Sequence, residues 1–241
     1  MTWLARLYIW ATYRLYDELA WAYDLVSWLV SLGHWSGWRR KALDYVVGQR
    51  VLEVGFGTGE LLVEMAGRDL AGIGLDSSLA MHRVTARKLS RQHVNVPRLQ
   101  GLVQAMPFAD GQFDSILCTF PAGYVLEAQT LVEVARLLRT CNPLIGQGGG
   151  RLVVVGMAVW MENRLWRRAT QLLFGVGGET VVDRFQRLAE AAGLQVSVVD
   201  QEGRGLRVPV VLAERCSPDP APGALDIREE EGGGKDDARA G

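Results

Sequence analysis

Short apolar runs alternate with segments of helical apolar spacing between residues 48 and 215. Runs rich in β-branched residues are typical of buried strands, whereas apolar residues that recur every three to four positions are typical of amphipathic helices. The runs predict seven strands, at residues 51–54, 70–75, 99–103, 113–119, 151–155, 194–200 and 206–213. The segments between them predict helices at residues 59–67, 78–92, 127–139 and 180–192.

This order of elements predicts an α/β fold. Repeated strand–helix units imply a parallel sheet that is covered by helices on both faces. No helical pattern separates the last two strands, so they are expected to form a hairpin. The sequence therefore predicts a mostly parallel sheet of seven strands with an antiparallel edge strand.

The segments on either side of this region differ from it in composition. Residues 1–47 hold six of the eight tryptophans, several at helical spacing, and are expected to form two or three helices that lie against the main domain as a cap. Residues 216–241 are acidic and rich in Pro and Gly, with few large apolar residues, which predicts a disordered tail. The α/β domain is expected to span residues 48–215.

Composition and charge argue against several classes of protein. The net charge is -1, so no overall basic field points to nucleic acid. The three cysteines and three histidines lack the spacing of metal ligands, and no metal site is expected. The longest uncharged N-terminal run, residues 25–38, is shorter than the ~20 residues that span a bilayer. No signal-peptide pattern is present, so a cytoplasmic location is expected; no pattern indicates an oligomeric state.

The first predicted strand ends in a glycine-rich turn that leads into a helix. In open α/β sheets, ligands bind at the carboxyl ends of the strands, and glycine lets the backbone approach a ligand closely. A dinucleotide motif requires glycines two and then three residues apart. Gly55 and Gly57 meet the first part of this rule. The position that requires the third glycine is occupied by Glu60, and the third glycine stands one residue earlier, at Gly59. Glu53 would pair with the ammonium group of a zwitterion and repel a pyrophosphate.

Asp76 follows the second predicted strand. An acid at this position can accept hydrogen bonds from both hydroxyls of a ribose. The alternative role is the N-cap of the next helix, for which Ser77 and Ser78 are also candidates. The ribose role is favoured.

Three segments, residues 51–59, 76–81 and 106–114, together resemble the class I S-adenosylmethionine-dependent methyltransferases. The third is similar to that family's "L-P-F-x-D-x-x-F-D" stretch. The resemblance extends over roughly residues 48–215 and implies a Rossmann-like, doubly wound fold. It also implies S-adenosyl-L-methionine as the cofactor.

The resemblance implies specific contacts with that cofactor. Glu53 and the glycines would hold the amino-acid end, Asp76 the ribose and Met81 the adenine, while Thr119 and Phe120 would line the mouth beside the sulfonium. The complete set of implied cofactor-binding residues is Glu53, Gly55, Phe56, Gly57, Gly59, Asp76, Ser77, Met81, Leu102, Val103, Thr119 and Phe120.

Three residues of this set depart from the family pattern. Leu102 and Val103 stand where the family often has an acid followed by Ala, so the backbone N–H of Val103 is the group expected to reach the adenine. Phe56 replaces a small residue and is expected to narrow the pocket.

A second resemblance concerns the methyl acceptor. Residues 22–40 resemble the start of the ubiquinone/menaquinone biosynthesis C-methyltransferases, which carry a "Y-D … L-x-S-L-G … W-R-R" run. This implies a small lipophilic acceptor. Tyr23 and His34 are the candidates for a general base. The N-terminal helices and a basic, Trp-containing segment at residues 160–174 are candidates for acceptor or peripheral membrane contact, with helix packing as the alternative.

Three alternative functions stay open. The acceptor could instead be a phospholipid amine or a small natural product. The chain could be a non-catalytic scaffold that binds the cofactor, which Leu102 and the lack of an evident base favour. The third alternative is a fold of the nucleotide-dehydrogenase type, against which Glu60 argues.

Overall fold

The computed structural model describes residues 34–121, 123–141, 148–157, 160–161, 178–203 and 206–215. The predicted helices within residues 1–33, the segment 162–174 and the predicted tail 216–241 lie outside the described residues. Within the part of the chain that the structure describes, every helix is too short or too polar to cross a bilayer.

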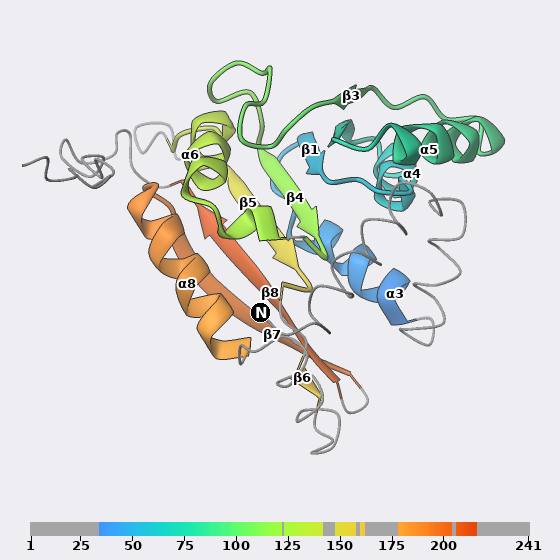
Figure 1. Ribbon diagram of the computed structural model, residues 1–241. Helices are drawn as coiled ribbons and strands as arrows, with labels where there is room; N and C mark the ends of the chain where they lie inside the picture. The colour runs from blue at the N-terminus through green and yellow to red at the C-terminus, as the bar shows by residue number, and fades with distance from the viewer. Residues whose placement is uncertain are drawn as a thin grey trace, which may run out of the picture.

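A single mixed sheet forms the centre of the domain (Figure 1). Its strand order is β3-β2-β1-β4-β5-β8, with β6 and β7 both paired to β8. The strands are β1 (Arg50–Val54), β2 (Ala71–Asp76), β3 (Arg98–Gln100), β4 (Ser115–Thr119), β5 (Arg151–Val155), β6 (Trp160–Met161), β7 (Gln195–Gly203) and β8 (Leu206–Glu214).

The fold class predicted from the sequence is confirmed. Strands β1 to β5 are parallel, and β7 and β8 form the expected antiparallel hairpin. The strand that reverses direction is β8, which pairs with β5 on one side and with β7 on the other. One edge of β8 pairs with β7 along its whole length. The other edge of β8 pairs first with β5, up to Val155, and then with the two-residue β6.

The third strand is shorter than predicted. We expected residues 99–103, but β3 spans Arg98–Gln100 and leaves Leu102 and Val103 outside the sheet. Its neighbour β2 ends at Asp76, which pairs with Gln100. Beyond that point β2 offers β3 no backbone partner except the carbonyl of Asp76, which accepts from Gly101 N–H at 3.2 Å.

Helices cover both faces of the sheet (Figure 1). One core lies beneath α6 and α8, and the other lies beneath α3, α4 and α5. The described helices are α3 (His34–Lys41), the 3-10 turn η2 (Ala42–Tyr45), α4 (Glu60–Gly67), α5 (Leu79–Arg91), the 3-10 turn η3 (Gly123–Leu126), α6 (Ala128–Leu137) and α8 (Gly178–Ala191).

Strand β1 contributes side chains to both cores. Leu52 and Val54 lie in the core under α6 and α8, whereas Val51 lies in the core under α3 and α4. Since alternate residues of a strand share a face, Glu53 points to the same face as Val51. The strand order reverses between β1 and β4, and the carboxyl ends of these two strands therefore mark the expected ligand site.

Asp114 fixes the opposite end of β1. Its Oδ2 accepts the backbone N–H groups of Gln49 at 3.1 Å and Arg50 at 3.0 Å, and its Oδ1 accepts from Arg50 Nη2 at 2.8 Å. Burial alone would raise the pKa of Asp114, but the hydrogen bonds from Arg50 outweigh it and lower the pKa to about 2. The ionised carboxylate thus anchors β1 beside β4.

We expect Asp114→Asn to lower the free energy of unfolding at neutral pH by about 2 kcal/mol, because buried N–H groups lose a charged acceptor. The folded pKa lies below the unfolded value of about 3.9, so this contribution is present above pH ~4 and disappears as the pH falls towards 2. Urea unfolding at pH 7 and pH 3 measures both effects. Asp44→Asn, at an exposed carboxylate, is the control; an equal loss in both variants would refute the anchoring role.

Candidate functional site

The turn after β1 is built on glycines in the left-handed region of the backbone. Gly55, Gly57 and Gly59 have φ values of 69°, 54° and 74°. Gly55 N–H donates to Leu75 O at 2.7 Å, and Gly59 N–H donates to Phe56 O at 2.9 Å. Side chains are disfavoured at such φ values, which explains the alternating glycines.

The three glycines have different surroundings. A Cβ atom at Gly55 would lie 2.6 Å from Tyr124 Oη, and one at Gly59 would overlap the side chain of Thr85. A Cβ atom at Gly57 would meet no described atom within 4 Å. The backbone at Gly57 is therefore the open side of the turn, where a ligand can approach.

Asp76 joins the turn to the second strand. It is 8% exposed, and its Oδ2 accepts Gly57 N–H at 2.8 Å while its Oδ1 accepts Ser78 N–H at 2.9 Å. Burial raises the pKa of Asp76, and these backbone N–H groups oppose the rise. The N-cap of α5 is Ser78, whose Oγ accepts Met81 N–H at 3.3 Å. The capping role that Asp76 could have had is thus filled by Ser78.

Glu53 is a buried carboxyl group beside this turn. It is 1% exposed, and its Oε2 has no hydrogen-bond partner among the described residues. Burial raises the pKa of Glu53 to about 8; the charge of Arg39 opposes this rise, and the nearby Asp76 adds to it. A buried carboxyl with an unused oxygen can receive a cation, because a positive charge would offset the cost of its ionisation.

Phe56 does not narrow the crevice, contrary to our expectation. Its side chain is buried in the core under α3, α4 and α5, where it packs against Gly74. Its ring also makes an edge-to-face contact with His82, with the ring centroids 4.8 Å apart. Because the left-handed glycines on both sides turn the chain, the Phe56 side chain points beneath the turn and not into the site.

The remaining residues of the expected set differ in their exposure to solvent. Ser77 is exposed, and Leu102 is an exposed apolar residue at 64%, whereas Met81 and Val103 are buried. Thr119 ends β4, and Phe120 follows it with a φ of 50°. Buried Met81 and Val103 offer a ligand little side-chain surface in this arrangement, while Leu102 offers an apolar surface to solvent.

Two side chains near the turn were not expected from the sequence. Tyr124, in η3, brings its hydroxyl against Gly55 and within 3.3 Å of Cys118 Sγ. Arg39, in α3, forms an ion pair with Glu60 at 2.9 Å. The sequence did carry one signal for Arg39, since Arg39 belongs to the W-R-R run. Tyr124 is distant in sequence from the glycine turn at residues 55–59, and no motif pointed to it.

The candidates for a general base are not tested by the structure. Tyr23 lies outside the described residues, and only the backbone of His34 is described, at the start of α3. Among the described side chains, no group of three or more His, Cys, Asp or Glu residues is arranged to hold a metal ion.

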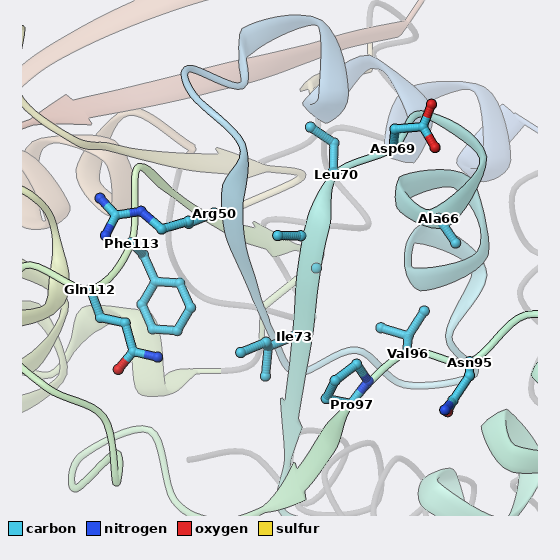
Figure 2. Close-up of a pocket in the computed structure, with 12 residues that line it drawn as sticks. Arg50, Ala66, Asp69, Leu70, Ile73, Asn95, Val96, Pro97, Gln112 and Phe113 are labelled. Carbon is cyan, nitrogen blue, oxygen red and sulfur yellow. The ribbon is translucent and has the colours of Figure 1, made fainter.

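An open groove of about 600 Å³ lies at the opposite end of the sheet (Figure 2). Its walls include Arg50 and Ala71, the first residues of β1 and β2, together with Ile73 and Val96. Ligands of open α/β sheets bind at the carboxyl ends of the strands. The glycine turn, and not this groove, is therefore the candidate site.

Comparison with solved structures supports the fold. The geranyl diphosphate C-methyltransferase of Streptomyces coelicolor superposes with a TM-score of 0.56 at 16% identity, covering 75% of this chain and 79% of that protein. A Thermotoga maritima protein described as an S-adenosylmethionine-dependent methyltransferase gives a TM-score of 0.57 at 20% identity, covering 80% of this chain and 95% of that protein. These superpositions show that the chain has a Rossmann-like fold.

Sequence comparison gives matches over part of the chain. Residues 51–141 match the family model described as "Methyltransferase domain". The demethylmenaquinone methyltransferase of Renibacterium salmoninarum is 34% identical over 143 residues, which cover 58% of this chain and 56% of that protein. The ubiquinone/menaquinone biosynthesis C-methyltransferase of Geotalea uraniireducens is 34% identical over 135 residues, covering 52% and 57%.

These matches confirm the resemblance to methyltransferases, because residues 51–59, 76–81 and 106–114 all lie within the matched domain. The chain spans little more than half the length of the two relatives named above. The fold is also shared with the [4+2]-cyclase SpnF, with a TM-score of 0.53 at 16% identity over 74% of this chain and 79% of that protein. The fold alone therefore does not define the reaction.

We expect Gly59→Ala to lower the free energy of unfolding by at least about 1 kcal/mol, because alanine is strained at positive φ and would also overlap Thr85. Gly67→Ala is the matched control, since Gly67 lies within α4 and a Cβ atom there meets nothing described within 4 Å. Chemical denaturation of the wild type and the two variants measures these free energies of unfolding. Equal stability in both would contradict the strained turn.

Proposed function

We propose that the chain is an S-adenosylmethionine-dependent methyltransferase that acts on a small lipophilic acceptor, with carbon methylation of a quinone-like compound favoured. The observation that carries the proposal is a pair of buried acids, Glu53 and Asp76, on either side of a left-handed glycine turn at the carboxyl end of β1. The relatives named for quinone methylation support the choice of acceptor.

The residues at the turn fit this cofactor. Oε2 of Glu53 has no hydrogen-bond partner among the described residues and can accept from the ammonium of the methionyl group. Asp76 Oδ2 accepts Gly57 N–H and Oδ1 accepts Ser78 N–H, and Ser77 N–H also donates to this carboxylate. The lone-pair capacity that remains can accept a ribose hydroxyl. The open side of Gly57 allows the backbone to approach the ligand.

Other expected contacts complete the proposed site. Gly55, Gly57 and Gly59 shape the turn, and the backbone of Phe56 continues it, while its side chain belongs to the core. Ser77 and the exposed Leu102 would border the adenosine. Thr119 and Phe120, at the end of β4, would line the opening towards the acceptor.

When bound, S-adenosylmethionine supplies an electrophilic methyl group on its sulfonium. The work of the protein is to orient the two reactants and to exclude water. Glu53 would bind the ammonium group of the cofactor and Asp76 its ribose hydroxyls, and together they would hold the sulfonium in position. The β4 end at Thr119 would then present the acceptor in line with the methyl group. Tyr23 and His34 stay candidates for the base that a phenolic acceptor would need.

Transfer of a labelled methyl group tests the proposal. The full chain, given methyl-labelled S-adenosylmethionine with extracted quinones and phospholipids, should place label in the quinone fraction. Label on headgroup amines alone would overturn the quinone assignment, and cofactor binding without any turnover would favour the scaffold alternative.

We expect Asp76→Ala to weaken cofactor binding by ~1–3 kcal/mol, the cost of leaving buried polar partners unpaired. Calorimetry with S-adenosylhomocysteine measures the effect in the absence of turnover. Asp183→Ala, at an exposed acid on α8, is the control and should bind as the wild type does. An unchanged dissociation constant in Asp76→Ala would reject the ribose role.

Glu53 should make cofactor binding depend on pH. With a pKa of about 8, Glu53 is mostly protonated at pH 7, and an incoming ammonium favours its carboxylate. Binding therefore releases a proton, and affinity should rise about tenfold per pH unit between pH 6 and about 7.5. Calorimetry in buffers of different ionisation enthalpy counts that proton.

The variant Glu53→Gln provides the control for this prediction. It removes the titrating group while keeping its size, so its affinity should be lower at pH 7.5 and nearly independent of pH below that value. A wild-type affinity that stays constant from pH 6 to 7.5 would show that Glu53 does not pair with the ammonium.

A further inference from the structure

We propose that Arg39 binds the carboxylate of the cofactor's methionyl group, with Glu60 holding the guanidinium in position. The inference rests on the proposed function and adds a residue outside the glycine turn, from the helix that precedes β1. A zwitterionic amino acid needs both an anionic and a cationic partner. Glu53 is the proposed partner of the ammonium, and Arg39 would be that of the carboxylate.

Arg39 lies close to the turn although it comes from a different element. Its Nη1 is 2.9 Å from Oε2 of Glu60, the first residue of α4, which directly follows Gly59. The side chain of Arg39 is only 12% exposed. The guanidinium is therefore held at the amino end of α4, next to the backbone where the methionyl group would lie.

The helix that carries Arg39 is firmly anchored. Trp38 precedes Arg39, and Ala42 and Leu43 follow it closely; all three are buried in the same core as Leu61 and Leu62 of α4. A side chain on such a rigid support can recognise a ligand with little loss of conformational freedom.

Electrostatics connect Arg39 with Glu53. Glu53 points to the face covered by α3 and α4, and Arg39 is the cation whose charge lowers the pKa of that buried carboxyl. The guanidinium presents five N–H donors in a planar fork, and its pairing with Glu60 runs through Nη1. Bidentate binding of a carboxylate by the remaining donors matches the known preference of arginine.

The neighbouring cations are less suitable. Arg40 is 62% exposed and pairs with Glu64 at 2.9 Å, one turn further along α4. Lys88 approaches the other oxygen of Glu60 at 3.7 Å and donates to the hydroxyl of Thr58 at 3.3 Å. Arg40 thus faces away from the amino end of α4, and Lys88 supports the turn from α5.

Selectivity between two forms of the cofactor tests the inference. Calorimetry would compare S-adenosylmethionine with decarboxylated S-adenosylmethionine, which lacks only the carboxylate. We expect the wild-type chain to prefer the complete cofactor at least tenfold. Arg39→Gln should lose this preference while its affinity for the decarboxylated form changes less than threefold. Arg40→Gln, the matched control, should keep the preference.

Other outcomes would overturn the inference. If Arg39→Gln kept the preference, or if both forms weakened in parallel, Arg39 would be only a structural partner of Glu60. If Arg39→Gln failed to fold, Arg39→Lys would replace it, and it should show a preference between those of wild type and the Gln variant. An unaltered preference in Arg39→Lys would also count against carboxylate binding by the guanidinium fork.

The failure of the proposed function would look different. If the wild-type chain bound neither form, nor the neutral analogue 5′-methylthioadenosine, the assignment of the glycine turn would fail as a whole. If the wild-type chain bound both forms equally, the turn would still bind the cofactor and the role of Arg39 alone would be wrong.

Discussion

The hydrogen bond from Gly57 N–H to Asp76 connects two turns that the chain forms independently. One turn joins β1 to α4, and the other joins β2 to α5, where the same carboxylate also accepts Ser78 N–H. Thr85 of α5 adds a bond from its hydroxyl to Gly57 O at 2.9 Å. The shape of the glycine turn therefore depends on β2 and α5 as much as on its own glycines, and the proposed cofactor site depends on that shape.

The arrangement of charge around this turn follows from the two-sided packing of the sheet. Side chains alternate between the two faces of β1, so Glu53 points to the face under α3 and α4, where it is buried. The positive charge of Arg39 acts on Glu53 there. Burial raises the pKa of Glu53 to about 8, so the carboxyl is largely protonated at neutral pH and no unpaired charge is buried there. A cationic ligand would favour the ionised form of Glu53. Glu53 is thus a buried carboxyl that would ionise when a cationic ligand binds, at the place where the proposed function needs a negative charge.

Local sequence signals predicted the elements around the turn well, because alternating glycines and apolar periodicity act over a few residues. The glycines at 55, 57 and 59, the strand before them and Asp76 at the end of β2 lie where the sequence predicted them. The predicted end of β3 was wrong because the length of β3 depends on where its neighbour β2 ends. The side chain of Phe56 and the approach of Tyr124 were missed because both depend on packing between elements that are distant in sequence.

A crystal structure of the chain with S-adenosylhomocysteine tests the central claim most directly. The account predicts density over Gly55–Gly59, with the ribose hydroxyls on Asp76 and the amino group on Glu53. Density for the ligand at the amino ends of the strands, in the groove beside Arg50 and Ile73, would contradict it. So would a ligand at the turn whose amino group lies away from Glu53.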